Sequence, residues 1–529
     1  MSKNSPSGFI RYQSRSKRPD GSEYAIYCPP CHGNPNPEKR IDKDIWLGKV
    51  LDKEKGVYYN TKQGPFVFNI ESGFQTLSTS EIKMYEKILT ESSNSIVKTN
   101  KSYNLSIDFG DIYILTEYLK KEHLLDLFTY SLDCNKDTLI SLIIFRIICS
   151  KSNKFAFNWW NETFTKFLFP EAQLKSQQIS NFLIDLGSEI NFRKYIIDHI
   201  NYIRCLTPKY FILIDSTGLP NDIKIPITAI NNHNGIVNNE IRLIMVIESN
   251  TGLPVYYRYV PGNIIDVSTL NMIIMELREY NIRVNRAVLD AGYYSKENLI
   301  YLYDNNIPFI TRMVEKVLDH KKLISEHKSS IKSRNNYINF NNRHLYIKKV
   351  PIQLFNGLIS AFAYLCLDID KEHQDQIKFL TNHIENASNE ELEIASNKFG
   401  IFIILSTIDF PSNEILPYYY TRQDIEQIFD YLKNEIDVLP IRVHSEASFS
   451  GHLLLSFMAL TAYKSLHKSL KLNNINIKNA FDALSRYHCR VYKNRIIPDV
   501  ANKSVNDICK ALKIKLPKTI DIKGIKTLF

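Results

Sequence analysis

The chain has 529 residues, of which 44% are hydrophobic and 23% are charged, and its formal net charge is +10. This length allows several domains and a large core, and no apolar run reaches the length of about 18 residues that a transmembrane helix needs. The first residues lack the pattern of an export signal, and the eight cysteines are scattered. We therefore expect a cytoplasmic protein without a disulfide framework, and no membrane partner.

The beginning of the chain is predicted to be a basic arm followed by a β-rich region, together residues 1–75. Five of the first twenty residues are Lys or Arg against one Asp, a composition that favours contact with a nucleic-acid backbone. Short strand-like runs and turn residues follow. Cys28 and Cys31 form a close pair ahead of His32, but no second pair accompanies them, so we do not expect a zinc or haem site there.

Residues 76–206 have the apolar spacing of helices. One interpretation is a DNA-binding helix-turn-helix arrangement with residues 176–186 as the recognition helix, and the other is a plain helical bundle. The expected helices are 80–92, 113–130, 136–150 and 176–187.

Two aspartates in the middle of the chain directly follow short apolar runs. Asp215 comes after residues 210–214, and Asp290 comes after residues 286–289. Such runs are typical of buried strands, so each aspartate is expected at a sheet edge, where α/β sheets bind ligands. An aspartate in this position can also be a turn former or a helix cap.

The segments between these aspartates predict the order of the elements. Two strands form a hairpin after the Asp215 strand, and Asp266 is expected to cap a helix that runs to about Tyr280. The Asp290 strand, a helix and a fifth strand complete a layout of three strands, helix, strand, helix, strand. This order predicts an α/β RNase H-like core with a mixed sheet. The further expected elements are strands 241–248, 255–260 and 308–312 and a helix over 296–305.

An amphipathic helix over residues 419–433 supplies a third carboxylate. At about 100° per residue, its polar side chains fall on one narrow stripe. A solvated helix face with internal ion pairs is the alternative interpretation. Three clustered carboxylates repel one another unless a cation lies between them, as in two-metal phosphoryl-transfer sites. The residues of the stripe are Tyr419, Arg422, Glu426 and Lys433.

Together these motifs resemble those of the DDE transposases of bacterial insertion sequences, in the group marked by Y-x2-R-x3-E-x6-K. The stripe matches that signature in full, and Asp215 and Asp290 lie in segments that resemble the two acidic motifs. The resemblance covers about residues 205–465 and extends to the hairpin, to the turn before Asp266 and to His452. Residues 231–239 lack the Ser-Lys-Asp pattern of the group.

The resemblance implies a function and a set of site residues. Asp215, Asp290 and Glu426 would be catalytic and would hold two Mg²⁺ ions, for which Mn²⁺ can substitute. The DNA-binding residues would be Tyr419, Arg422 and Lys433. The enzyme would cleave the ends of an insertion sequence and join them to target DNA by phosphoryl transfer.

The same resemblance implies partners, and two alternative functions remain open. The partners would be double-stranded DNA, as terminal inverted repeats and as target, and a second copy of the chain in a synaptic complex at the bacterial nucleoid. An RNase H-like endonuclease without strand transfer would use the same residues. A catalytically inactive DNA-binding derivative is the third possibility, which the intact carboxylates and the intact stripe disfavour.

The distance of 136 residues from Asp290 to Glu426 exceeds what an RNase H core needs. We expect the core to comprise residues 207–313 and 400–436, with a mostly β insertion over residues 314–399. In relatives, an aromatic residue of this insertion stacks on a flipped base. The insertion has no Trp, so a Tyr or Phe would take that role.

The end of the chain, residues 437–529, is predicted to be a basic helical region. From Pro440 to Phe529 there are sixteen Lys or Arg against five Asp or Glu, a balance of +11, which leaves about −1 for the rest. Such a charge favours contact with DNA phosphates, and a solvated Lys-rich helix face is the alternative.

Overall fold

The computed structural model divides the chain into two compact units, Met1–Asn104 and Leu105–Phe529. Within the part of the chain that the structure describes, no helix is long and apolar enough to cross a membrane. The described residues are 8–14, 23–30, 44–60, 63–86, 105–149, 151–221, 223, 225–233, 236–264, 266–382, 395–436, 438–522 and 524.

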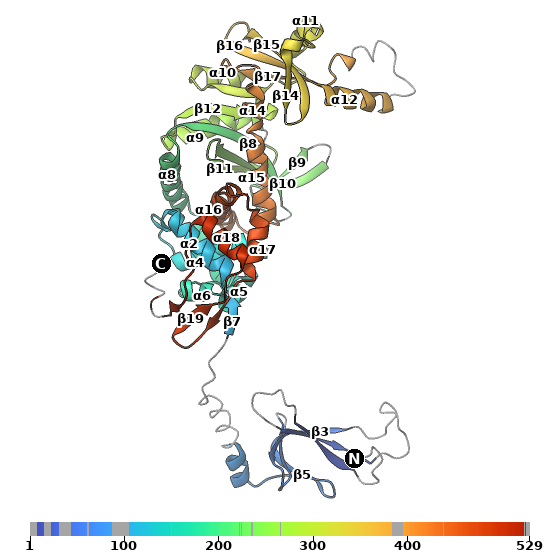
Figure 1. Ribbon diagram of the computed structural model, residues 1–529, viewed down its shortest axis with the longest axis vertical. Helices are drawn as coiled ribbons and strands as arrows, with labels where there is room; N and C mark the ends of the chain where they lie inside the picture. The colour runs from blue at the N-terminus through green and yellow to red at the C-terminus, as the bar shows by residue number, and fades with distance from the viewer. Residues whose placement is uncertain are drawn as a thin grey trace. The chain divides into compact units, whose positions relative to one another are not determined.

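The first unit is a six-stranded antiparallel meander, which confirms the β-rich prediction (Figure 1). Its small core contains Ala25, Leu47, Tyr58, Phe66 and Phe68. Residues 79–86 are helical, and the rest of the helix expected over 80–92 lies outside the described residues, as do Cys31, His32 and most of the basic arm. The strands are β1 (Phe9–Ser14), β2 (Glu23–Cys28), β3 (Ile45–Asp52), β4 (Val57–Asn60), β5 (Gly64–Asn69) and β6 (Gly73–Gln75).

The second unit begins with a strand and a set of helices. The helix expected over residues 113–130 is two helices, because His123 takes a left-handed conformation with φ 58° and ends the first of them. The elements are β7 (Leu105–Asp108), α2 (Gly110–Lys121), α3 (Leu124–Thr129), α4 (Lys136–Ile148), α5 (Ala156–Glu162), α6 (Thr165–Leu168), α7 (Ser176–Leu186) and α8 (Glu189–Leu206).

A ten-stranded mixed sheet forms the centre of the second unit. Its first five strands lie in the order β11-β10-β8-β12-β13, with β12 parallel to both β8 and β13 and the other pairs antiparallel. The strands are β8 (Tyr210–Pro220), β9 (Ala229–His233), β10 (Ile236–Glu248), β11 (Pro254–Pro261), β12 (Val284–Leu289) and β13 (Phe309–Arg312), with helices α9 (Leu270–Glu279) and α10 (Lys296–Asp304).

The segment predicted as an insertion extends this sheet. Its three strands are joined to β13 through β17 (Ile401–Ser406), in the order β13-β17-β16-β15-β14. Pairing along β17 satisfies backbone groups that would otherwise form an exposed edge. The prediction missed two helices here, α11 (Leu318–His327) and α12 (Ile369–Asn382). The strands are β14 (Tyr337–Phe340), β15 (Arg343–Leu354) and β16 (Ile359–Asp368).

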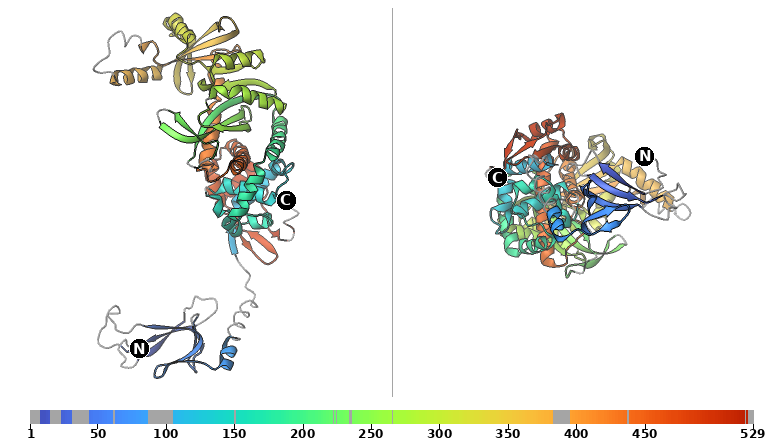
Figure 2. Two further views of the ribbon diagram at one scale, coloured as in Figure 1. Left: turned by 180° about the vertical axis from the view of Figure 1, so that it is seen from behind. Right: turned by 90° about the horizontal axis from the view of Figure 1, so that it is seen from below.

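The C-terminal part contains helices, as expected, but also three strands that the prediction missed. Strands β18 (His488–Val491), β19 (Arg495–Pro498) and β20 (Ile520–Asp521) form a sheet with β7, from the start of the unit. Helix α16 (Glu446–Lys471) is buried along most of its length and contacts α7 and α4, and Figure 2 shows it from behind, enclosed by helices. The remaining helices are α17 (Ile477–Ser485) and α18 (Lys503–Leu512).

Candidate active site

Strand register brings the two predicted aspartates together. In the parallel pair of β8 and β12, Leu289 lies beside Ile214, so the next residues, Asp290 and Asp215, emerge side by side. Asp215 is still part of β8, whereas Asp290 begins the short 3-10 helix η4 (Ala291–Tyr293). We call this edge of the sheet, with Asp215 and Asp290, the carboxyl edge.

The segment that carries the other predicted residues is not one regular helix. Helix α14 (Ile415–Tyr420) is followed by a tight turn, in which Arg422 N–H bonds to Tyr419 O at 3.2 Å, and then by α15 (Gln423–Asp430). A π-helical turn, η7 (Tyr431–Glu435), follows. These irregular turns interrupt the regular helix, although Tyr419, Arg422 and Glu426 still lie next to one another along the segment.

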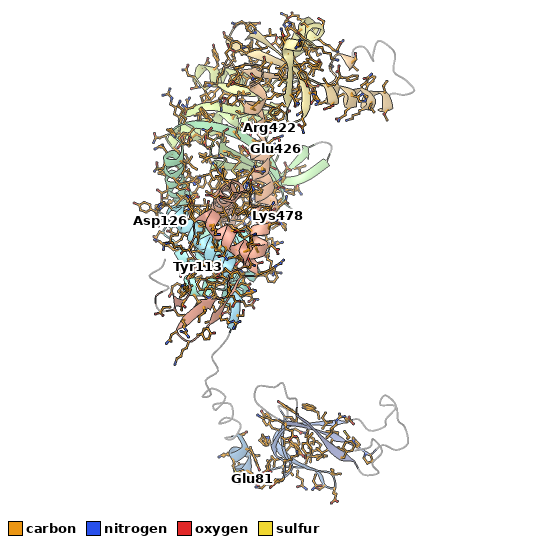
Figure 3. The ribbon with its side chains drawn as sticks, viewed as in Figure 1. Glu81, Tyr113, Asp126, Arg422, Glu426 and Lys478 are labelled. Atoms are coloured by element: carbon orange, nitrogen blue, oxygen red, sulfur yellow. The ribbon has the colours of Figure 1, made fainter. Side chains whose placement is uncertain are left out.

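Arg422 links the third predicted carboxylate to the carboxyl edge. Its Nη1 donates to Asp290 Oδ1, and its Nη2 donates to Glu426 Oε1 at 2.7 Å. Figure 3 shows Arg422 and Glu426 next to each other, close to the strands of the central sheet. One guanidinium therefore lies between two carboxylates from distant parts of the chain, where its positive charge offsets their repulsion.

Asp215 is the most strongly perturbed group of the carboxyl edge. Burial raises its pKa to about 7, and the negative charges of Asp290 and Asp266 add to this shift. The Ser216 backbone N–H, which donates to Asp215 Oδ1 at 2.8 Å, and the Arg422 charge oppose it. A carboxyl group that is costly to ionise without a cation is typical of a functional site.

Tyr419 and Lys433 occupy supporting positions. Tyr419 is only 6% exposed, and its ring lies 6.0 Å from the Arg422 guanidinium carbon; burial raises the pKa of this phenol to about 12. Lys433 Nζ donates to Thr217 Oγ1 in β8 at 2.6 Å. Burial lowers the pKa of Lys433, and the nearby charge of Glu240 raises it. The structure thus gives Tyr419 a contact with Arg422 and Lys433 a contact with the strand of Asp215.

Comparison with known proteins identifies the domain that contains these residues. Residues 207–462 match the protein-family model described as "Transposase DDE domain". The chain carries a transposase DDE domain. No curated protein matches it. Among solved structures it is similar to "Cryo-EM structure of piggyBac transposase synaptic complex with hairpin DNA", with 10% identity over 76% of this chain and 80% of that chain and a TM-score of 0.38.

The DDE domain contains a fourth carboxylate near the carboxyl edge that sequence reasoning assigned to another role. Asp266 was expected to cap a helix, but its carboxylate accepts hydrogen bonds from the Ser216 hydroxyl at 2.5 Å and from Arg242 Nη1 at 2.9 Å. It begins the 3-10 helix η3 (Asp266–Ser268), ahead of α9. The cap prediction was wrong: the N-cap of α9 is Thr269, and the Asp266 oxygen is bonded to two polar side chains from neighbouring strands. Its position after the Pro-Gly-Asn turn was the only sequence signal.

The donor chemistry of the DDE domain suits magnesium, but the present side-chain arrangement does not form a closed ion site. Carboxylate oxygens are the ligands that Mg²⁺ prefers. Among the described residues, no group of three His, Cys, Asp or Glu side chains is placed to hold an ion. Arg422 lies between Asp290 and Glu426 instead. An ion bound by Asp290 and Glu426 would have to displace the Arg422 guanidinium from them.

His452, part of the sequence resemblance, is a structural residue in α16. Its Nε2 donates to Val438 O at 3.0 Å, and its Nδ1 accepts from Arg146 Nη2 at 2.9 Å. Burial and the Arg146 charge lower its pKa to about 3, so the ring is neutral. A neutral histidine with both nitrogens bonded holds α16 against α4 and has no capacity left for a ligand.

Proposed function

We propose that this protein is a DNA transposase that cleaves the ends of an insertion sequence and joins them to target DNA by two-metal-ion phosphoryl transfer. The observation that carries the proposal is the register of β8 and β12, which sets Asp215 and Asp290 side by side within a transposase DDE domain. The strand order β11-β10-β8-β12-β13 supports an RNase H-like core, because three antiparallel strands are followed by two parallel ones.

The proposed roles follow from the chemistry of the carboxyl edge. Asp215, Asp290 and Glu426 would hold two Mg²⁺ ions, or Mn²⁺, and the bound ions would supply activation of the attacking hydroxyl and stabilisation of the leaving oxygen. Two ions would offset the cost of burying the Asp215 charge, which raises its pKa, and the repulsion from Asp290 and Asp266 that adds to it. Arg422 then exchanges its carboxylate partners for a DNA phosphate, for which a planar guanidinium is well suited.

Two further elements are proposed to contact DNA around the scissile bond. Lys433 and Tyr419 lie on either side of Arg422 in the sequence and would bind phosphates near the cleaved end. Helix α7 exposes Gln177, Gln178 and Asn181, whose amides are able to read adenine in a major groove. The proposed partners are therefore double-stranded terminal repeats and target DNA, and a second copy of the chain that bridges two ends in the synaptic complex.

Metal-dependent cleavage of an element end tests the proposal. The full chain is incubated with Mg²⁺ and a duplex that contains the inverted repeats bracketing its gene. We expect Asp215→Asn and Glu426→Gln to abolish nicking, whereas Asp430→Asn, an exposed change in the same helix as Glu426, should leave nicking intact. Near-wild-type nicking by Asp215→Asn would contradict the assignment.

A second assay separates a transposase from an endonuclease with the same fold. Pre-cleaved ends are supplied together with a supercoiled target plasmid. A transposase joins the 3′ ends of the duplex to the plasmid, whereas an endonuclease gives only nicked plasmid. Joined products that depend on Glu426 would support strand transfer, and their absence with active nicking would favour the endonuclease.

A further inference from the structure

A partly buried charge network lies next to the carboxyl edge. Arg242, in β10, is 8% exposed and forms ion pairs with Asp266 at 2.9 Å and with Glu240 at 3.6 Å. Its Nη1 also donates to the Ser216 hydroxyl at 3.1 Å, and that hydroxyl donates to Asp266. We call Ser216, Glu240, Arg242 and Asp266 the acid brace. Its members come from β8, β10 and η3, and Ser216 directly follows Asp215 in the chain.

Glycines in three motifs make room for the acid brace. A Cβ at Gly218 would overlap the Glu240 carboxylate, and a Cβ at Gly262 would overlap Glu240 backbone and side-chain atoms. A Cβ at Gly292 would lie 3.2 Å from Asp266 Oδ2 and 3.9 Å from Asp290 Oδ2. The second oxygen of Asp266 and the carboxylate of Asp290 therefore both approach the same glycine.

A second set of hydrogen bonds ties the segment of Asp266 to the segment of Asp290. Asn298, at the start of α10 and 2% exposed, donates to Val267 O in η3 at 2.8 Å and to Tyr293 O in η4 at 3.0 Å. One end of η3 is thus bonded to the strand of Asp215, through Ser216, and its middle is bonded to the turn of Asp290. Because buried polar groups are costly to leave unpaired, these contacts fix the two catalytic segments relative to each other.

We propose that Asp266 is a positioning residue of the active site, which holds the segments of Asp215 and Asp290 in place and adds negative charge behind the metal ligands. This inference rests on the proposed function. In this role, Asp266 contacts neither substrate nor metal. It acts through Ser216 and the backbone of η3. Groups in this position around a metal site typically change metal affinity or activity by about 10- to 100-fold when they are replaced.

Manganese binding measures this role independently of catalysis. The full-length protein is titrated with Mn²⁺ by calorimetry, and its melting temperature is measured without metal. Asp266→Asn keeps an oxygen that can accept from Ser216 and Arg242 but removes the charge, so we expect a wild-type fold and Mn²⁺ binding weakened about tenfold. Asp266→Ala removes the contacts as well and should weaken binding further. Asp304→Asn, exposed at the end of α10, is the matched control.

The magnesium dependence of end cleavage gives the second measurement. Asp266→Asn should shift the Mg²⁺ concentration for half-maximal cleavage upward by about tenfold and recover activity at high Mg²⁺, which a general loss of stability would not do. If Asp266→Asn does not fold, Ser216→Ala removes only the hydroxyl, with its bonds to Asp266 and Arg242, and should give a smaller shift in the same direction. Wild-type Mn²⁺ affinity and Mg²⁺ dependence in the folded variants would overturn the inference and leave the proposed function standing. If Asp266→Asn weakens Mn²⁺ binding but the wild-type protein cleaves no DNA, the role of Asp266 in metal binding stands and the proposed function is wrong.

Discussion

Two parts of the unit Leu105–Phe529 bury ionisable side chains in opposite ways. At the carboxyl edge, Asp215 is buried beside other carboxylates, and its pKa rises to about 7. In helices α8 and α16, His199 and His452 are buried and bonded to backbone oxygens, and His452 is also bonded to the Arg146 guanidinium. Burial, and for His452 also the Arg146 charge, lowers their pKa values to about 4 and about 3. The histidines are satisfied by the surrounding protein, whereas the aspartate is in an environment that an added cation would improve. Burial of an ionisable group beside like charges, as at Asp215, is therefore the kind that indicates a functional site.

The largest effect is expected when Arg422, the cation that contacts the carboxyl edge, is replaced. Arg422→Ala leaves Asp290 and Glu426 without the guanidinium between them and removes the proposed phosphate contact. Loss of a charge-assisted contact worth roughly 3–4 kcal/mol would lower end cleavage by about 100- to 1000-fold. The measurement is single-turnover cleavage at saturating Mg²⁺.

Two variants control for loss of charge and for loss of a helical ion pair. Arg422→Lys should also be impaired, because an ammonium cannot bridge two carboxylates as a planar guanidinium does. Arg193→Ala breaks an exposed pair with Glu189 at the same spacing and should cleave normally. Equal activity of Arg422→Ala and Arg193→Ala would show that Arg422 is only a structural partner.

For the buried His452 we expect a loss of stability with little loss of DNA cleavage. His452→Ala removes the bonds to Val438 O and to Arg146, so we expect the free energy of unfolding to fall by about 2–4 kcal/mol. End cleavage at low temperature should stay close to wild type, because the ring is not part of the carboxyl edge. Urea denaturation at pH 7.5 provides the measurement. Lost cleavage with unchanged stability would move His452 into the active site.

The pH dependence of stability distinguishes the two kinds of burial. The raised pKa of Asp215 means that the folded protein binds more protons than the unfolded chain between pH 4 and about 7, so this group makes stability fall as pH rises through that range. The lowered pKa values of His199 and His452 act in the other direction, because they make stability fall as pH drops below about 6.5.

Asp215→Asn removes the first of these effects. Without divalent cations, we expect the variant to gain about 2–3 kcal/mol relative to wild type between pH 5 and pH 8, as measured by urea denaturation in a chelator. Added Mg²⁺ at pH 8 should reduce the difference by stabilising the wild type. A pH-independent difference would mean that the carboxyl group is ionised at ordinary pH even without a cation.

The smallest effect is expected where the added strands meet the catalytic segment. Arg343 in β15 donates to the Tyr420 hydroxyl at 2.9 Å, and Phe340 stacks on the Tyr420 ring at 5.4 Å between centroids. Tyr420→Phe removes only the hydroxyl and should cost about 0.5–1.5 kcal/mol of stability. Thermal melting detects this change. A large loss of cleavage by the same variant would show that strands β14 and β15 help to place Arg422.

The transposase family was predicted from a few residues, whereas the contacts among the site residues were not. Short apolar runs predicted the strands before Asp215 and Asp290, and the spacing from Tyr419 to Lys433 predicted a transposase, which the match of residues 207–462 confirms. The roles of the individual site residues stay predictions. The helix expected over 419–433 is present as the end of α14, α15 and η7, and the turn at Arg422 and the π-helical turn are departures that the apolar spacing did not predict.

Contacts between segments distant in sequence could not be predicted from the pattern of residues. The C-terminal region was predicted only as basic and helical, and the prediction did not show that α16 within it is buried against α7 and α4. Strand β18 pairs with β7, nearly 400 residues earlier. Composition measures charge and apolar content and cannot show which distant segment covers a helix face.

The sequence by itself determined the chemical groups, because carboxylates at strand ends and a spaced Tyr, Arg, Glu and Lys are local features of the chain. Only the tertiary structure decided that Asp290 stands beside Asp215, that Arg422 bridges Asp290 and Glu426, and that Asp266 belongs to the acid brace rather than to a helix cap. The physical reason is that strand register and side-chain hydrogen bonds are settled by competition among partners far apart in the chain. No local pattern records the outcome of that competition.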